Sequence, residues 1–250
     1  MSTRLITRRR AIVTGLASLG ALAAAKYPGQ LPPTHGNLLR IGDAFTYAAQ
    51  RALLPGQSLV REYSPDDLTS FPATGTTDPG ASVKSALGQS YRRLQAAGFG
   101  DWRLQVEGRV STPRAFSLAD LKQLSARTQI TRHTCEEGWT AIGQWTGVPL
   151  SVVLASVGVL PTARYVVFYS YDEWVDSIDM LDALHPQTLL AYGMNGRDLP
   201  VPHGAPVRLR VERQIGYKSV KFLHRIVVSD QFNGGEASSI ESGWAWYTGI

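Results

Sequence analysis

The fold assignment depends on the stretch Arg132-His133-Thr134-Cys135-Glu136-Glu137-Gly138-Trp139, which contains the only cysteine among the 250 residues. A lone cysteine excludes an internal disulfide and makes an iron–sulfur cluster implausible. A thiolate is a soft metal ligand, but Cys135 and His133 together are too few for a zinc site. Two functional interpretations stay open: Cys135 is a nucleophile assisted by a histidine, or it is the single protein ligand of a metal whose other ligands come with a cofactor. The structural alternative is a small buried side chain.

A second group of unusual residues lies further along the chain. The segments are His203-Gly-Ala-Pro-Val-Arg208 and Gly216-Tyr-Lys-Ser-Val-Lys221. An arginine and two lysines flank glycine-bearing turns there, and such turns offer backbone N–H groups that suit a phosphate-like anion. Taken alone, the pattern also fits a solvated basic loop.

The regular elements mix strands with short helices and show no repeated strand–helix alternation, which predicts an α+β fold. The patterns predict strands at residues 101–107, 164–170, 207–212 and 225–230. They predict helices at residues 43–53, 117–124, 149–157 and 179–184. Residues 26–90 are rich in Pro, Gly, Ser and Thr, and we expect an extended arm there.

Several motifs in order resemble the sulfite-oxidase-like molybdopterin oxidoreductases, and most closely the branch of the bacterial periplasmic protein-methionine-sulfoxide reductases. The resemblance spans about residues 65–230. Beyond the two groups above, it rests on the segment 104–124, Cys135-x-x-Gly138-Trp139, Trp145-Thr-Gly-Val-Pro-Leu150, His185-Pro-Gln-Thr-Leu189 and Gly196-Arg-Asp-Leu-Pro200. It implies a molybdopterin-binding fold of mixed sheets with short helices over residues 91–250, without the C-terminal dimerisation domain of sulfite oxidases.

The resemblance also implies roles for individual residues. Cys135 would be the one protein thiolate on molybdenum, the other sulfurs coming from a single pterin, and this bond would keep the thiol from oxidation. The residues implied to bind the cofactor are Ser70, Ser170, His203, Arg208, Lys218, Ser219, Val220 and Lys221. Ser170 stands where relatives carry a Thr, His203 where they carry an Asn, and Ser70 where an Asn is expected.

The substrate side of such a site needs groups that steer an oxyanion or polarise an S=O bond. We expect Cys135, Arg132 and His133 to be the catalytic residues, with Lys218 and His203 as further candidates for this steering. Trp139 and Trp145 are expected in the core, with the wall of a thioether pocket as the alternative. The apolar tail around Trp244 and Trp246 is expected to cover the core, with partner docking as the alternative.

The charge of the chain points to export rather than to nucleic acid. Residues 1–26 carry five basic side chains and no acidic one, so 20 basic and 20 acidic groups remain in the rest, and no basic nucleic-acid-binding face is implied. Residues 1–25 read as an export signal with a basic start, an apolar stretch of 15 residues and a small-residue end. Thr7-Arg-Arg-Arg-Ala-Ile-Val13 resembles a twin-arginine signal. We expect a periplasmic or otherwise exported protein; a general secretory signal and an uncleaved anchor are the alternatives.

The expected function is two-electron oxygen-atom transfer by a molybdenum–molybdopterin oxidoreductase on a small or peptide-bound S-oxide, N-oxide or sulfite-like substrate. The protein is expected to be a monomer that exchanges electrons with a separate partner, either a membrane heme subunit or a cytochrome. Two other classes stay open. One is a secreted Cys–His hydrolase or transferase, and the other is a noncatalytic binding module that kept the fold and lost the metal.

Overall fold

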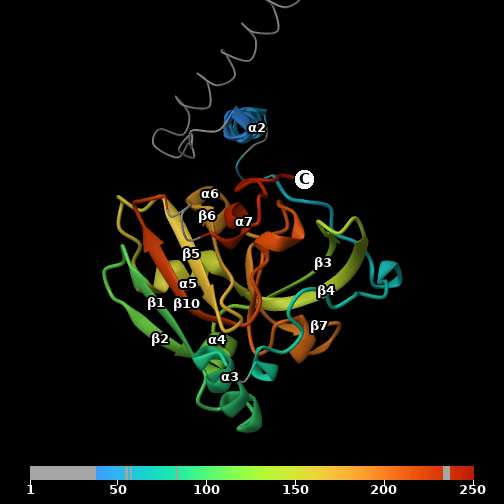
Figure 1. Ribbon diagram of the computed structural model, residues 1–250, viewed down its shortest axis with the longest axis vertical. Coiled ribbons are helices and arrows are strands. Elements are labelled where there is room, and N and C mark those ends of the chain that lie inside the picture. The colour runs from blue at the N-terminus through green and yellow to red at the C-terminus, as the bar shows by residue number, and fades with distance from the viewer. Residues whose placement is uncertain (1–37, 54–55, 57, 83, 233–236) are drawn as a thin grey trace, which may run out of the picture.

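The computed structural model describes residues 38–250 except 54–55, 57, 83 and 233–236. The export signal expected at residues 1–25 therefore lies outside the described residues, as does the beginning of the expected arm. Figure 1 shows two sheets side by side, with α5 (Leu150–Val157) between them. Among the described residues, no helix is long and apolar enough to cross a membrane.

The first sheet has the strand order β2-β1-β10-β5-β6, with β1 and β10 parallel and the other pairs antiparallel. Its strands are β1 (Arg103–Gly108), β2 (Arg114–Ser117), β5 (Tyr165–Ser170), β6 (Val175–Asp179) and β10 (Leu223–Ser229). Buried and exposed residues alternate at the start of β1, as the sequence pattern predicts for a half-buried strand. The main hydrophobic core packs against this sheet and includes Trp102, Phe116 and Phe168.

The second sheet has the order β3-β4-β7-β8, and β9 pairs with β7. Its strands are β3 (Arg127–Thr134), β4 (Thr140–Pro149), β7 (Leu189–Met194), β8 (Arg197–Asp198) and β9 (Arg208–Arg210). Strand β4 bulges between Thr146 and Gly147, and a Cβ atom at Gly147 would lie 2.2 Å from the carbonyl oxygen of Leu190. Glycine is therefore required where β4 approaches β7.

The remaining helices are short apart from α2 and α3. They are α2 (Leu38–Leu53), α3 (Ala86–Ala96), α4 (Leu118–Gln123), α6 (Met180–Ala183) and α7 (Ser238–Glu241), with 3₁₀ turns at Pro65–Asp67, Pro79–Ala81, Val201–His203 and Gly216–Lys218. The capping box predicted at Ser117 and Asp120 is present and begins α4.

The α+β prediction is confirmed, with differences in detail. Helix α2 is longer than the predicted helix at 43–53, and the strand predicted at 207–212 is reduced to the three residues of β9. Helix α3 begins at Ala86, inside the range expected to be an extended arm, because the Ser85 side chain accepts a hydrogen bond from the Gly88 amide and caps it. Part of the expected arm, residues 62–69, runs beside β3 and β4: the Tyr63 amide donates to the Ile130 carbonyl of β3, and the Thr69 amide donates to the Ile142 carbonyl of β4.

A buried ion cluster fastens α2 to the body of the protein. Arg51 donates to both Asp179, at 2.8 Å, and Asp182, at 2.8 and 3.1 Å, and the Tyr47 hydroxyl donates to Asp179 at 2.7 Å. Arg51 and both carboxylates are about 98 % or more buried. A charge in such surroundings is tolerated only while its partners are present.

We predict that Arg51→Ala lowers the free energy of unfolding by about 3–5 kcal/mol, because it leaves buried carboxylates uncompensated. Urea unfolding followed by circular dichroism measures this change. Arg109→Ala is the matched control, since Arg109 pairs with Asp230 at the surface and such a pair contributes at most about 1 kcal/mol. An equal decrease in the free energy of unfolding in the two variants would show that the ion cluster of α2 does not stabilise the folded protein.

Candidate functional site

A tight turn between β3 and β4 positions the cysteine. The backbone N–H of Cys135 donates to the Trp139 carbonyl at 2.9 Å, and the N–H of Gly138 donates to the Cys135 carbonyl at 3.1 Å. Gly138 has φ +89°, which a residue with a side chain rarely adopts. The Cys-x-x-Gly-Trp motif is thus explained by the turn that it has to form.

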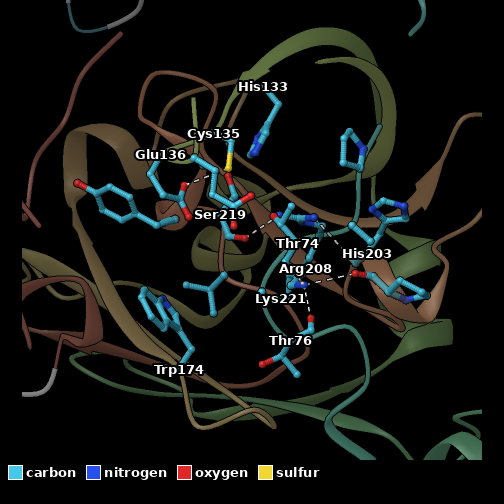
Figure 2. A pocket seen from close by; sticks show the side chains of 18 of the residues that line it. Thr74, Thr76, His133, Cys135, Glu136, Trp174, His203, Arg208, Ser219 and Lys221 are labelled. Carbon is cyan, nitrogen blue, oxygen red and sulfur yellow. Dashed lines mark hydrogen bonds between the residues drawn. The ribbon is translucent and has the colours of Figure 1, made fainter. Parts of the chain in front are cut away.

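Cys135 lines a cavity of about 310 Å³. Figure 2 shows Cys135 beside His133 and above Ser219, with Arg208 and Lys221 further down in the view. Five parts of the chain far apart in sequence meet here: the β3–β4 turn, the segment 202–221, the stretch 71–76, the pair Asp172 and Trp174, and Trp244. Ser70, an expected cofactor ligand, is exposed and does not line the cavity.

Two cations of the cavity have no carboxylate partner in the described part of the chain. Arg208 donates to the carbonyls of His203 (3.0 Å), Ser219 (2.8 Å) and Leu209 (3.4 Å). Lys221 donates to the carbonyls of Thr74 (2.8 Å), Pro202 (3.3 Å) and Thr76.

Their environment disfavours the positive charge in the absence of an anion. Burial, followed by the neighbouring Arg210, lowers the pKa of Arg208 to about 9. Burial, followed by Arg208, lowers the pKa of Lys221 to about 8. Two crowded cations whose hydrogen bonds go to carbonyl oxygens, and which form no ion pair with a described carboxylate, form a site for an anion.

The backbone beside these cations strengthens the anion site. Ser219, Val220 and Lys221 all line the cavity, and the N–H groups of Val220 and Lys221 donate to no acceptor among the described residues. The Ser219 hydroxyl accepts from the amide of Val211 at 3.2 Å, which fixes this turn against β9. Free N–H groups next to two cations are typical of a phosphate-binding turn.

His133 is held as a neutral hydrogen-bond donor. Its Nδ1 lies 2.7 Å from Arg210, and because a guanidinium only donates, Nδ1 accepts and the ring proton is on Nε2. Burial, followed by Arg210 and Arg208, lowers the pKa of His133 to about 2. Arg210 is fixed in turn by Glu212, at 2.7 and 3.0 Å. His133 can donate through Nε2 but is not a general base.

This geometry also argues against the Cys–His hydrolase alternative. Burial and the nearby Glu136, whose carboxylate is 3.5 Å from Sγ, raise the pKa of Cys135 despite an opposing backbone hydrogen bond. A catalytic thiolate needs the opposite, a lowered pKa beside a histidine that can accept its proton.

Other expected site residues are placed differently. His203 lines the cavity, and burial followed by Arg208 and Lys221 lowers its pKa to about 4. Lys218 is fully buried outside the cavity lining and pairs with Asp176. Ser170 is buried and its hydroxyl is bonded to Asp172 and the Trp174 carbonyl. Arg132 is exposed on the opposite face of β3 and does not line this cavity.

Aromatic side chains that the sequence did not assign to the site form much of its wall. The rings that line it are Phe71, Trp139, Trp174, Tyr217 and Trp244. Trp139 had been expected in the core, as had Trp145, which is fully buried. Tyr217 and Trp244 lie 4.9 Å apart between ring centroids, so a residue of the C-terminal tail closes the cavity. No periodic pattern marks these positions, because they come together only in the tertiary structure.

Comparison with known proteins agrees with this site. Residues 92–236 match the family model described as the oxidoreductase molybdopterin-binding domain. The chain belongs to this family. It carries the molybdopterin-binding domain of these oxidoreductases, and the cofactor that the family implies is molybdenum held by molybdopterin.

Relatives and a solved structure are consistent with the assignment. The chain is 41 % identical over 158 residues to a putative protein-methionine-sulfoxide reductase subunit, YedZ1, of Azospira oryzae, covering 63 % of this chain and 58 % of that protein. It is 33 % identical over 182 residues to the protein-methionine-sulfoxide reductase catalytic subunit MsrP of Xanthomonas campestris, covering 64 % and 53 %.

The sulfane dehydrogenase SoxCD of Paracoccus pantotrophus matches with a TM-score of 0.50 and 27 % identity, over 53 % of this chain and 39 % of that one. The chain spans somewhat more than half the length of the two curated relatives described here. The sulfite-oxidase-type fold expected from sequence is confirmed.

The described residues fit the cofactor. They contain no group of three or more His, Cys, Asp or Glu side chains that could hold a metal by themselves. A single buried thiol beside an anion site therefore suits a metal that brings its other ligands and a phosphate with it.

Lys221 makes the stability of the cofactor-free protein depend on pH. Its pKa of about 8 in the folded protein lies below the ordinary value of 10.5, so between these values the unfolded chain holds a proton that the folded chain has lost. We predict that the stability of the cofactor-free protein contains a component that rises with pH from 8 to about 10. Urea unfolding should show this rise in the wild type and a flatter profile in Lys221→Met; parallel profiles would contradict it.

Gly216 is required next to His133. An added Cβ atom would lie 2.5 Å from Nε2 of His133, and the ring cannot retreat because Arg210 holds its other side. We predict that Gly216→Ala destabilises the protein by about 1–3 kcal/mol. Gly42→Ala on α2, where an added Cβ meets nothing within 4 Å, is the control and should not destabilise. If Gly216→Ala leaves the free energy of unfolding unchanged, the His133 ring can move away from the added methyl group.

Proposed function

We propose that this protein is an exported reductase that removes the oxygen atom from a sulfoxide, using a molybdenum–molybdopterin cofactor and electrons from a separate redox partner. The observation that carries the proposal is one cavity that combines the lone thiol of Cys135 with an anion site at Arg208 and Lys221. The names of the relatives YedZ1 and MsrP support a methionine sulfoxide as substrate. The basic and apolar start of the chain supports export.

In this proposal the residues of the site divide the work of holding the cofactor. Cys135 ligates the metal through its thiolate. Arg208, Lys221 and the N–H groups of Val220 and Lys221 hold the phosphate. When bound, the cofactor supplies two-electron oxygen-atom transfer, and the protein provides position and electrostatics.

The substrate side of the site follows from His133 and the aromatic wall. The Nε2–H of His133 donates to the sulfoxide oxygen, whose partial negative charge accepts it, and the ring stays neutral at all physiological pH values. Trp139, Trp174 and Trp244 offer apolar surface to the alkyl groups of the sulfoxide. Overall, two electrons and two protons convert the S=O group to a thioether and water, and the electrons come from the reduced partner.

The test uses full-length protein purified from a host that makes molybdopterin. We expect about one molybdenum per chain and reduction of methionine sulfoxide by a reduced viologen dye, with dimethyl sulfoxide, trimethylamine N-oxide and sulfite as comparison substrates. Cys135→Ser should abolish turnover. Arg208→Met should reduce the molybdenum content, since it removes a phosphate donor.

Two results would contradict the proposal. One is full oxygen-transfer activity in Cys135→Ser, which would remove the thiol from the chemistry. The other is a loaded wild-type protein that oxidises sulfite and reduces no sulfoxide, which would reverse the proposed direction and change the substrate.

A further inference from the structure

A second cavity, of about 250 Å³, lies on the other side of β3 from the cofactor cavity. Arg132 and His133 are consecutive residues of β3, so their side chains leave opposite faces of the strand. His133 lines the cofactor cavity, and Arg132 lines this second one. The arginine that sequence reasoning expected beside the metal thus belongs to a different site, which the proposed function does not use.

Three arginines give the second cavity its charge. They are Arg61, Arg132 and Arg213, and none of them forms an ion pair with a carboxylate within the described ranges. Arg61 and Arg132 are exposed, and Arg213 is buried and donates to the Gly56 carbonyl at 2.8 Å. All but one of the acidic residues of the chain, Glu236, lie within those ranges.

The carboxylates near these arginines have other partners. Glu212 lines the cavity, but Arg210 binds both of its oxygens and Gln129 donates to one of them at 3.1 Å. Glu62, next to Arg61 in sequence, pairs with Arg127. Asp67, which interacts with Arg61, is bonded to Ser64, and Asp182, which interacts with Arg213, pairs with Arg51. The side chains that line the cavity carry three positive charges and one negative charge, so the cavity is complementary to an acidic group.

The rim of the cavity is apolar and open to solvent. Leu59 is 57 % exposed and Ile250 is 46 % exposed, and both line the cavity. Exposed aliphatic side chains around arginines are typical of protein interfaces, which are enriched in arginine and buried apolar contacts. A free inorganic ion would use the arginines and leave these side chains in water.

We propose that this cavity is the docking site for an acidic segment of a protein partner, which inserts a carboxylate among Arg61, Arg132 and Arg213 and covers Leu59 and Ile250. The identification of that partner as the electron donor rests on the proposed function. The position of the second cavity supports this identification, because two hydrogen bonds link it to the cofactor cavity. Arg210 donates to Glu212 of the second cavity at 2.7 Å and to His133 of the cofactor cavity at 2.7 Å.

The test measures binding directly and needs no turnover, so its failure is distinguishable from failure of the proposed function. The probe is a fluorescent peptide of alternating glutamate and leucine residues, and its glutamine counterpart is the reference. Fluorescence polarisation with the full chain should show that only the glutamate peptide binds. The affinity should fall when salt is raised from about 20 to about 200 mM.

The variants locate the binding site. The double variant Arg61→Gln, Arg132→Gln should weaken binding at least tenfold, while Arg197→Gln, an exposed arginine of β8 that lines neither cavity, should leave it unchanged. Equal thermal unfolding of the three proteins shows that the fold is intact. Equal binding by the double variant, equal binding of the glutamine peptide, or succinate binding as tightly as the glutamate peptide would overturn the proposal.

Discussion

The site depends on the repulsion between two cations, Arg208 and Lys221, that the fold brings together with no ion-paired carboxylate among the described residues. Both donate hydrogen bonds to backbone carbonyls, and each lowers the pKa of groups around it. A protein that needed only stability would place a carboxylate or an apolar side chain here. The two cations instead form an anion site that exists before the anion binds. A bound anion is attracted to both cations, so cofactor binding stabilises the folded protein.

The groups on the thiol side of the cavity are also fixed by few contacts. Cys135 is fixed by a backbone turn rather than by side chains, and His133 is fixed by Arg210, which is fixed by Glu212. The orientation of the His133 ring is thus fixed by two successive residues behind it, Arg210 and Glu212. The path from Glu212 to His133 also makes the two cavities neighbours, although they open on different faces of β3.

Sequence reasoning succeeded where local rules decide the structure. The helix that begins after Ser117 and the strand β1 follow from local sequence patterns, a start signal for the helix and alternation of apolar and polar residues for the strand. It was weaker where side-chain direction matters. Alternation along β3 sends Arg132 away from the cavity that His133 lines, and the 3₁₀ turn at Gly216–Lys218 sends Lys218 into the core toward Asp176 while Lys221 reaches the cavity. Of the aromatic wall, only Trp139 was weighed from sequence, as an alternative to a core position; Phe71 and Trp244 are distant in sequence and reach the cavity only through tertiary packing.

The central claim is that the cavity between Cys135 and Lys221 holds molybdenum through the thiol. Crystals of the loaded full chain, measured on both sides of the molybdenum absorption edge, test this most directly. We expect one anomalous peak within bonding distance of the Cys135 sulfur and none in the second cavity. A peak elsewhere in a loaded protein, with the Cys135 sulfur free of metal, would contradict the account.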